Sequence, residues 1–470
     1  MCRSLGSIQL GLRPLKTVGV RAPQPRAYHL SQHRSFVTSN LGYKCDVEAE
    51  PLHRYRSGGY HPVRLGDAFK KGRYKVLHKL GYGGFSTVWI ARDQSLNQNV
   101  ALKIVTSEDS SSRNRELCTH QRLSERSLPP MNDHKHIVRL LDYFEHPGPN
   151  GTHNCLVLEL LGPSVATVIE ERFASNRLPG SVAKKACKEM ALALEVLHAQ
   201  GIGHGDLHTG NVAFIIPGLK LLPEEELSKK LGKPRVGPVS RPDGEPLEPG
   251  MPEYLVWPAR LPANDPNFEK SSVKIIDFGE SFMSDNKAET LHTPLALRAP
   301  EVLFQNEYDL RVDYWSLGCT MFELVVGQPP FTSLMAKRED ILQQIADLIG
   351  EPPERWQPRW KAMPKWEPHD DDGPIYTLSQ WLDLLYFDGN ESPDFTRQEL
   401  AQFGRLVGKL LRWYPSDRPS VTEVLSDEWF HDCWGMGAGK VYPALTTPPH
   451  LSEFVCPTCR NSACDRDIFR

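Results

Sequence analysis

The chain holds an acid and an amide close together in a pattern suited to proton and metal chemistry. In His204-Gly-Asp206-Leu-His-Thr-Gly-Asn211, the amide follows the acid by five residues. A carboxylate here can accept a hydroxyl proton, and an amide oxygen suits Mg²⁺, a hard cation that prefers oxygen ligands. A second acid, Asp277, ends the apolar run Ile275-Ile276. Asp206 is therefore the candidate base, and Asn211 and Asp277 are the candidate metal ligands.

A glycine-rich turn, Gly81-Tyr-Gly83-Gly84-Phe-Ser-Thr-Val88, precedes these residues. Glycines let the backbone fold closely over phosphates, whose oxygens accept its N–H groups. The turn matches G-x-G-x-x-G-x-V except that Ser86 replaces the third glycine. It lies between predicted strands and does not open a helix, which argues against a dinucleotide site.

Lys103 ends the run Val100-Ala-Leu-Lys103, fifteen residues beyond Val88. It could reach phosphates under the glycine turn if a carboxylate oriented its ammonium group. We expect Glu116, on a predicted helix, to be that carboxylate. Glu108 and Asp109 are weaker candidates.

The elements that must position these residues fall into two blocks. Alternating and β-branched runs predict antiparallel strands at 73–80, 87–91 and 100–105. Apolar spacing predicts helices at 181–200 and 313–326, with helical structure continuing to about residue 430. Strands followed by helices in separate blocks indicate an α+β arrangement of a small sheet lobe and a larger helical lobe.

The composition excludes several other classes of protein. Lys plus Arg number 55 against 58 Asp plus Glu, a net charge of -3, so no global field favours nucleic acid or membrane. No apolar run reaches the roughly 18 residues of a membrane helix. The scattered cysteines favour reduced thiols. The trio Cys456, Cys459 and Cys464 resembles half a zinc site, but a disordered tail is the favoured interpretation.

The N-terminal segment is basic. Seven Lys or Arg residues and no acid precede Asp46. This composition fits either an organellar transit peptide or a disordered extension, and both alternatives stay open.

The motifs together resemble the eukaryotic protein kinases over roughly 74–430. Two further segments carry the resemblance, Leu297-Arg-Ala-Pro-Glu301 and Asp313-Tyr-Trp-Ser-Leu-Gly318, and Arg418 matches the arginine that family members pair with Glu301. The resemblance implies a bilobal fold and ATP with Mg²⁺ as cofactors, with Phe278 and Gly279 in the activation segment. The residues it places around ATP are Leu80, Gly81, Tyr82, Gly83, Gly84, Phe85, Ser86, Thr87, Val88, Ala101, Lys103, Glu116, Glu159 and Leu161.

A narrower resemblance is to the serine/arginine-rich protein kinases. It rests on Gly59-Tyr-His-Pro-Val-Arg-Leu-Gly-Asp67, on the glycine turn, and on a proline-rich insertion at 217–272. It implies a monomeric serine/threonine kinase of the nucleus and cytoplasm that acts on Arg/Ser-rich proteins and binds no nucleic acid or membrane. The basic leader leaves a mitochondrial location open.

The implied domains are a leader at 1–54, an N-lobe at 55–161, a C-lobe at 162–432 and a tail at 433–470. The insertion is expected to be a loop with one short helix at 223–231.

Two alternatives compete with this interpretation. The catalytic segment also resembles that of small-molecule kinases of the aminoglycoside and choline type, but these lack the Ala-Pro-Glu element found at Glu301. A catalytically weak scaffold with a kinase fold is the other alternative, and the intact Lys103, Asp206, Asn211 and Asp277 argue against it.

Three positions bear on regulation and substrate choice. Gly205 replaces the arginine that usually holds a phosphorylated activation loop, so the short 277–301 segment is expected to be ordered without modification. His208 replaces the lysine that helps to neutralise the transferring phosphate, or it merely packs locally. Asp340 and Asp347, on the predicted helix 337–350, share one face, which is either a docking site for Arg-rich peptides or an ordinary solvated surface.

Overall fold

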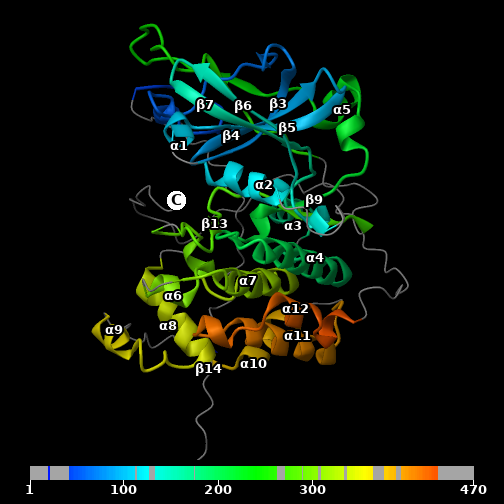
Figure 1. Cartoon of the computed structure of the whole chain (residues 1–470), viewed down its shortest axis with the longest axis vertical. Coiled ribbons are helices and arrows are strands. Elements are labelled where there is room, and N and C mark those ends of the chain that lie inside the picture. Colours follow the sequence, from blue (N-terminus) through cyan, green and yellow to red (C-terminus); the bar gives the residue numbers. More distant parts are fainter. Residues whose placement is uncertain are drawn as a thin grey trace, which may run out of the picture.

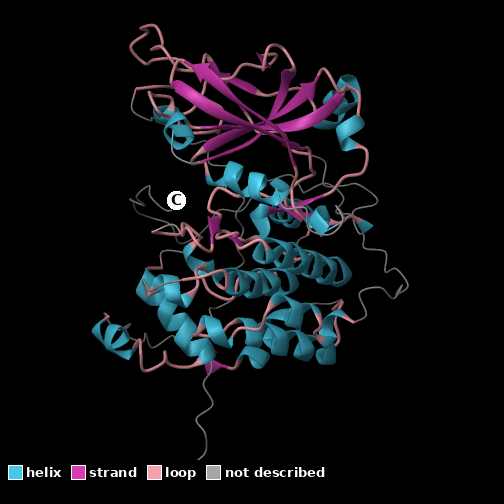
Figure 2. Cartoon of the chain, in the orientation of Figure 1, coloured by secondary structure: helices cyan, strands magenta, loops and turns pink. Residues whose placement is uncertain are grey.

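The computed structural model describes residues 20–21, 42–111, 114–125, 133–173, 175–261, 270–287, 289–304, 308–332, 336–363, 375–387 and 393–431. Strands gather in one lobe and helices in the other (Figures 1 and 2), as the sequence predicted. The predicted tail at 433–470, with its three cysteines, lies outside the described residues, as does most of the basic leader. No helix in the described ranges combines the length and apolar character that crossing a membrane requires.

The N-lobe is built on an antiparallel sheet with the order β2-β3-β4-β5-β7-β6. Successive side chains on its strands enter two different cores: Ile90 and Ala101 face the C-lobe side, whereas Trp89 and Leu102 belong to a second core on the outer face. Burial on both faces explains the β-branched and apolar runs at 87–91 and 100–105. The strands are β2 (Ala68–Phe69), β3 (Tyr74–Gly83), β4 (Ser86–Asp93), β5 (Gln98–Val105), β6 (Leu140–Gly148) and β7 (Gly151–Glu159), flanked by helices α1 (Ser107–Ser111) and α2 (Arg115–Glu125).

The outer face of the sheet is covered by two segments far apart in the chain. One is the N-terminal strap, which we define as residues 43–63. The other is the hairpin of β10 (Val236–Pro238) and β11 (Tyr254–Val256), which lies within the insertion. Lys44 and Ser240 form a bridge between them, and Val47 packs with Leu255 in one small core.

The structure differs from the sequence prediction in two places. The predicted leader extends to residue 54, but within it Val47 and Leu52 are buried, so the end of this segment is part of the folded N-lobe. The insertion is predicted as a loop of the C-lobe, but its described part packs on the N-lobe. For example, Arg92 and Asn99 both donate to the carbonyl of Leu222, at 3.0 and 2.9 Å. The expected short helix is present as α5 (Glu224–Leu231), beside the sheet (Figure 1).

Two buried helices organise the C-lobe (Figure 1). Helix α4 (Gly180–Ala199) packs against α7 (Val312–Val326), close to the predicted limits. Gly327 ends α7 with φ +94°, a left-handed C-cap that glycine adopts at little cost. The remaining elements are α3 (Val165–Arg172), β8 (Ile202–Gly203), β9 (Val212–Phe214), β12 (Val273–Ile275), β13 (Phe282–Met283), α6 (Pro300–Leu303), α8 (Arg338–Ile349), α9 (Gln357–Ala362), α10 (Leu378–Phe387), α11 (Arg397–Leu410), α12 (Val421–Leu425), and the pair β1 (Val20–Arg21) with β14 (Ile375–Tyr376).

Acid should weaken the N-lobe through a buried histidine cluster. The ring of His61 lies 4.8 Å from that of His146 and 5.0 Å from that of His153. Burial, with the charges of these two neighbours, lowers the pKa of His61 to about 3. The unfolded chain, with an ordinary histidine pKa of about 6.5, therefore binds more protons between these values, and stability falls as pH falls through this window.

We expect the free energy of unfolding to lose about 2 kcal/mol through His61 between pH 7 and pH 5. Measured by urea denaturation at both pH values, His61→Phe should reduce the acid sensitivity by about this amount. His53→Phe, at an exposed position, is the control. Equal acid sensitivity in wild type and His61→Phe would contradict the prediction.

Candidate active site

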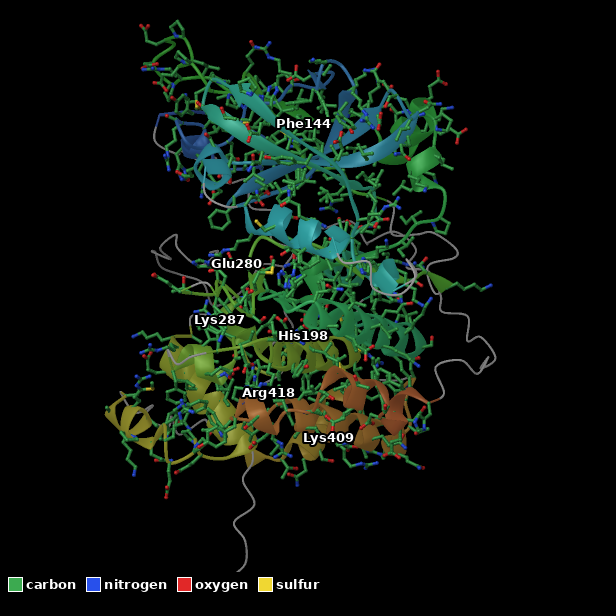
Figure 3. The ribbon with its side chains drawn as sticks, in the orientation of Figure 1. Phe144, His198, Glu280, Lys287, Lys409 and Arg418 are labelled. Carbon is green, nitrogen blue, oxygen red and sulfur yellow. The ribbon has the colours of Figure 1, made fainter. Side chains whose placement is uncertain are left out.

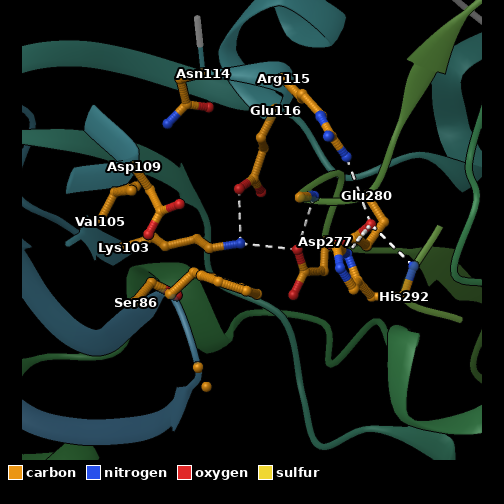
Figure 4. Close-up of a pocket in the computed structure, with 14 residues that line it drawn as sticks. Ser86, Lys103, Val105, Asp109, Asn114, Arg115, Glu116, Asp277, Glu280 and His292 are labelled. Atoms are coloured by element: carbon orange, nitrogen blue, oxygen red, sulfur yellow. Dashed lines mark hydrogen bonds and ion pairs between the residues drawn. The ribbon is translucent and has the colours of Figure 1, made fainter. Parts of the chain in front are cut away.

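Lys103 lies at the centre of a charged cluster between the lobes (Figure 4). Its Nζ is 2.6 Å from Oε2 of Glu116 and 2.9 Å from Oδ1 of Asp277. Strand β5 supplies the lysine and the first turn of α2 supplies the glutamate. Burial by itself would lower the pKa of Lys103, but the charges of Asp277 and Glu116 outweigh it and raise that pKa above its usual value. The lysine is therefore a fixed cation.

The structure brings Glu116 to Lys103, as expected, and gives the weaker candidates other partners. Glu108 pairs with Arg54 and Arg56, at 3.4 and 3.2 Å. Asp109 accepts a hydrogen bond from Thr106.

A cavity of about 270 Å³ opens beside this cluster, under the glycine turn. Its walls include Gly83, Gly84, Phe85, Ser86, Lys103 and Asp277. Figure 4 labels the last three of these. The expected phosphate ligands are thus placed around one space.

The remaining residues expected around ATP lie on the same strands or directly after them. Leu80, Gly81 and Tyr82 lead into the turn on β3, Thr87 and Val88 leave it on β4, Ala101 precedes Lys103 on β5, and Glu159 ends β7 shortly before Leu161. The carboxylate of Glu159 is engaged by Lys274 at 2.5 Å and by the Arg139 N–H at 2.8 Å. Its backbone N–H donates to the Arg139 carbonyl at 3.0 Å, so both the carboxylate and the N–H of Glu159 are already engaged.

Asp277 is held in an unusual backbone conformation. Its φ of +63° falls in the left-handed region, which aspartate tolerates better than most residues. The carboxylate accepts from the Gly279 N–H at 3.0 Å as well as from Lys103. Desolvation by neighbouring groups would raise the pKa of Asp277, but the charge of Lys103 and these hydrogen bonds hold it at about 2, while 47% of the side chain stays exposed. The strained backbone of Asp277 therefore fixes the direction in which its carboxylate points.

The candidate base, Asp206, is hydrogen-bonded to Asn211, the amide five residues after it. Asn211 donates through Nδ2 to the carbonyl oxygen of Asp206 at 2.9 Å and to its Oδ2 at 3.1 Å. The other carboxylate oxygen, Oδ1, is buried without a hydrogen-bond partner. An acceptor without a donor is suited to an incoming hydroxyl group. The pairing of Val212 with Ile275, between β9 and β12, brings this loop beside Asp277.

Asp313 holds the start of the 204–211 loop, which carries Asp206 and Asn211. Sequence reasoning missed this role. Its carboxylate accepts from the backbone N–H groups of His204 and Gly205, at 2.7 and 2.9 Å, and bonds Nε2 of His198 at 2.8 Å (Figure 3 labels His198). Burial raises the pKa of Asp313, but the hydrogen bond and charge of His198 outweigh it, so the pKa is lowered overall. An acid opening a long apolar helix was the available signal.

The structure explains why glycine stands at position 205. Gly205 has φ +78°, and a Cβ there would lie 2.5 Å from the carbonyl oxygen of Glu280. No arginine fits without moving the backbone. The carbonyl of Gly205 instead accepts from the Thr293 hydroxyl at 2.5 Å, and Arg298 donates to the carbonyl of Thr293 at 2.7 Å.

Glu280 makes further contacts that order the activation segment. Its carboxylate lies 3.1 Å from Nδ1 of His292 and 3.5 Å from Arg115 of α2 (Figure 4). Phe278 is fully buried, with its ring 5.2 Å from that of His120, and Gly279 lies at the cavity wall. The segment is thus held by unmodified side chains. At its end Glu301 pairs with Arg418 at 2.6 Å, as expected.

His208 lies beside the candidate base. Its Nε2 is 3.6 Å from Oδ2 of Asp206, and its Nδ1 accepts from the Gly210 N–H at 3.0 Å. The bond from Gly210 favours a neutral ring with its proton on Nε2. Burial also favours the neutral ring and would lower the pKa of His208. The hydrogen bond and charge of Asp206, with the charges of Glu323 and Asp277, outweigh burial, so this pKa is raised. Its charge is therefore open to titration.

We expect turnover to depend on this charge. The cationic form of His208 is present below its raised pKa and is lost as pH rises through it, so kcat should fall severalfold on the alkaline side of about pH 6.5. His208→Lys, which stays charged to about pH 10, should flatten that decline. The check is kcat against pH for wild type, His208→Lys and the control His53→Lys. An unchanged alkaline decline in His208→Lys would refute this role.

The oxygen atoms of Asp277 and Asn211 fit a hard divalent cation. The fit rests on the carboxylate of Asp277 and on the amide of Asn211, whose nitrogen is committed to Asp206. Within the described residues, no three His, Cys, Asp or Glu side chains form a metal site by themselves. A cation here would take its other ligands from phosphate and water.

The predicted docking acids lie on α8. Asp340 accepts from the Lys337 N–H at 2.7 Å and so caps the helix, and Asp347 accepts from Gln343 at 2.8 Å. Both side chains are half-buried.

Comparison with known proteins agrees with this geometry. The protein kinase domain model matches residues 74–220 and 265–430. The chain is 28% identical over 409 residues to a serine/threonine-protein kinase SRPK of Physarum polycephalum, which covers 82% of this chain and 92% of the relative. It is 27% identical to protein kinase dsk1 of Schizosaccharomyces pombe, over 83% of this chain and 86% of the relative. A shorter match, 37% identical over 178 residues, covers 37% of this chain and 24% of serine/threonine-protein kinase SKY1 of Saccharomyces cerevisiae.

The domain match breaks off after residue 220 and resumes at residue 265, before Asp277. The unmatched stretch contains the β10–β11 hairpin, which covers the N-lobe sheet. The order of the motifs, the geometry of the site and the similarity to these relatives all indicate the same family. The chain belongs to the protein kinase family, and within it is an SRPK-like serine/threonine protein kinase.

Proposed function

We propose that this kinase transfers the γ-phosphate of Mg-ATP to serine or threonine hydroxyls in Arg/Ser-rich protein segments. The observation that carries the transferase activity is the cluster of Lys103, Glu116 and Asp277, beside which the β9–β12 pairing holds the Asp206–Asn211 pair. The substrate class rests on the resemblance to kinases named SRPK, dsk1 and SKY1.

Each residue has a distinct task in this proposal. Lys103, held by Glu116, would bind phosphate oxygens of ATP. Asp277 and Asn211 would hold Mg²⁺, which neutralises phosphate charge during transfer. Asp206, through its orphaned Oδ1, would accept the hydroxyl hydrogen and orient the oxygen for in-line attack. Positioning and electrostatics then account for most of the acceleration.

The direct test is phosphate transfer from radiolabelled Mg-ATP to a peptide of Arg-Ser repeats. We expect transfer to this peptide to exceed transfer to a matched peptide in which glutamine replaces every arginine. Asp206→Ala provides the background. If wild type phosphorylates neither peptide above that background, a scaffold role is favoured. If it phosphorylates both peptides equally, the activity stands and the substrate class fails.

Substrate selection through α8 can be tested separately. Asp340→Asn combined with Asp347→Asn removes both charges, while the new amide oxygen at position 340 can still cap the helix. We expect KM to rise severalfold for the Arg-Ser peptide and to stay constant for the glutamine peptide. A matched control is Glu225→Gln with Glu226→Gln, two exposed acids on α5. An equal change for both peptides would exclude docking at α8.

We further propose that the basic leader determines the cellular compartment in which this kinase resides. Its composition supports mitochondrial import, whereas the resemblance to the SRPK group supports nucleus and cytoplasm. A fusion of residues 1–50 to a fluorescent protein should enter mitochondria if the leader is a transit peptide. Diffuse fluorescence would reject that role.

A further inference from the structure

The tip of the glycine turn receives a hydrogen bond from outside the kinase sheet. Tyr60, in the N-terminal strap, donates its hydroxyl to the carbonyl of Gly83 at 2.7 Å. Its side chain is almost wholly buried, whereas Gly83 itself is exposed at the cavity wall. A rigid side chain thus adds a second constraint to Gly83, which is otherwise held by its pairing with Ser86 across the turn.

Tyr60 is itself fixed by both covering segments. Its N–H donates to the Arg54 carbonyl at 3.0 Å, which closes a tight turn in the strap. Asn150, from the β6–β7 turn, donates to the carbonyl of Tyr60 at 2.7 Å and to that of Gly250 at 2.9 Å. Because Gly250 belongs to the insertion, one side chain ties the strap and the insertion together at this point.

A buried ion pair anchors the strap where the glycine turn begins. Glu50 of the strap pairs with Lys79 on β3, and both side chains are almost fully excluded from solvent. Tyr55 donates to the same Glu50 carboxylate. The insertion adds a backbone bond, from the Ala259 N–H to the Lys79 carbonyl, at 2.7 Å. Both ends of the β3 approach to the turn, Lys79 and Gly83, are therefore held from the outer face.

We propose that Tyr60 is a positioning residue for the phosphate-binding turn, through which the strap and insertion set the affinity for the nucleotide's phosphates. The effect is specific to phosphates because Gly83 lines the cavity beside Lys103, whereas the base is expected at the backbone of 159–161. Without the hydroxyl bond, the turn samples more conformations, and phosphate binding must order it again. This inference rests on the proposed nucleotide site.

The test compares two ligands that differ only in phosphates. In the full chain, Tyr60→Phe removes the hydroxyl and keeps the ring. We expect the Kd of Mg-ATP to rise about three- to tenfold, the effect of one hydrogen bond, with the Kd of adenosine unchanged. KM for ATP should rise by the same factor while kcat and the peptide KM stay constant.

Tyr254→Phe is the matched control. Tyr254 lies in β11, in the same outer layer, and its hydroxyl accepts from the Leu65 N–H at 2.9 Å without contacting the turn. It should weaken neither ligand. Equal weakening of ATP and adenosine in Tyr60→Phe, or an unchanged Kd for ATP, would overturn the proposal. If wild type binds neither ligand, the proposed nucleotide site itself fails, which is a different outcome.

Discussion

Asp206→Ala is expected to lower kcat by about two to four orders of magnitude, the range that a positioned base supplies. The carboxylate presents one oxygen to Asn211 and leaves the other buried without a partner, so the alanine variant loses the acceptor for the substrate hydroxyl. ATP affinity should change little, because Lys103, Glu116 and Asp277 make contacts with one another and not with Asp206. Single-turnover phosphate transfer and ATP titration separate the two quantities.

A control must remove a nearby charge without touching the reacting atoms. Asp285 is exposed on the activation segment, and Asp285→Ala should keep kcat within about twofold of wild type, as is usual for a surface substitution. If Asp206→Ala retained wild-type turnover, this loop would not be the catalytic site, whatever the family resemblance implies.

The largest expected loss of stability follows from Arg418→Met. Arg418 binds both oxygens of Glu301, at 2.7 and 2.6 Å, and both side chains are fully buried (Figure 3 labels Arg418). It also donates to the carbonyl of Arg311 at 2.8 Å. Removing it leaves a buried carboxylate without a counter-charge, which costs about 3–5 kcal/mol in free energy of unfolding.

Two variants separate the buried charge from the lost contacts, each measured by denaturant titration. Glu301→Met combined with Arg418→Met should be more stable than Arg418→Met alone, because no charge is then left unpaired. Arg405→Met breaks an exposed pair with Glu428, of similar length at 2.7 Å, and should cost no more than about 1 kcal/mol. Equal losses for Arg418→Met and Arg405→Met would rule out the stated mechanism.

Much of the chemistry could be predicted from local sequence. Lys103, Asp206, Asn211 and Asp277 are identified by residue type and order, because phosphate transfer requires a fixed cation, oxygen ligands and an acceptor. The strands and the two central helices also follow from local periodicity, which reports burial one element at a time.

The partner of Lys103 shows where such reasoning weakens. Glu108, Asp109 and Glu116 are all close in sequence to the lysine, but the first two lie on α1 and the third on α2, so the placement of two separate helices decides which acid meets it. Similarly, the need for glycine at 205 arises from the Glu280 carbonyl, which is brought there only by the path of the activation segment.

By itself, the sequence determined the reaction class and the two-lobed α+β plan, and it predicted Lys103, Asp206, Asn211 and Asp277 as the central site residues. Only the tertiary structure decided that the strap and the insertion, nearly two hundred residues apart, share one layer over the glycine turn. The physical reason is that pairing across such a distance depends on complementary buried surfaces. No periodicity or motif around Tyr60 or Gly250 predicts that the two residues lie close together. Their proximity is therefore visible only in the folded chain.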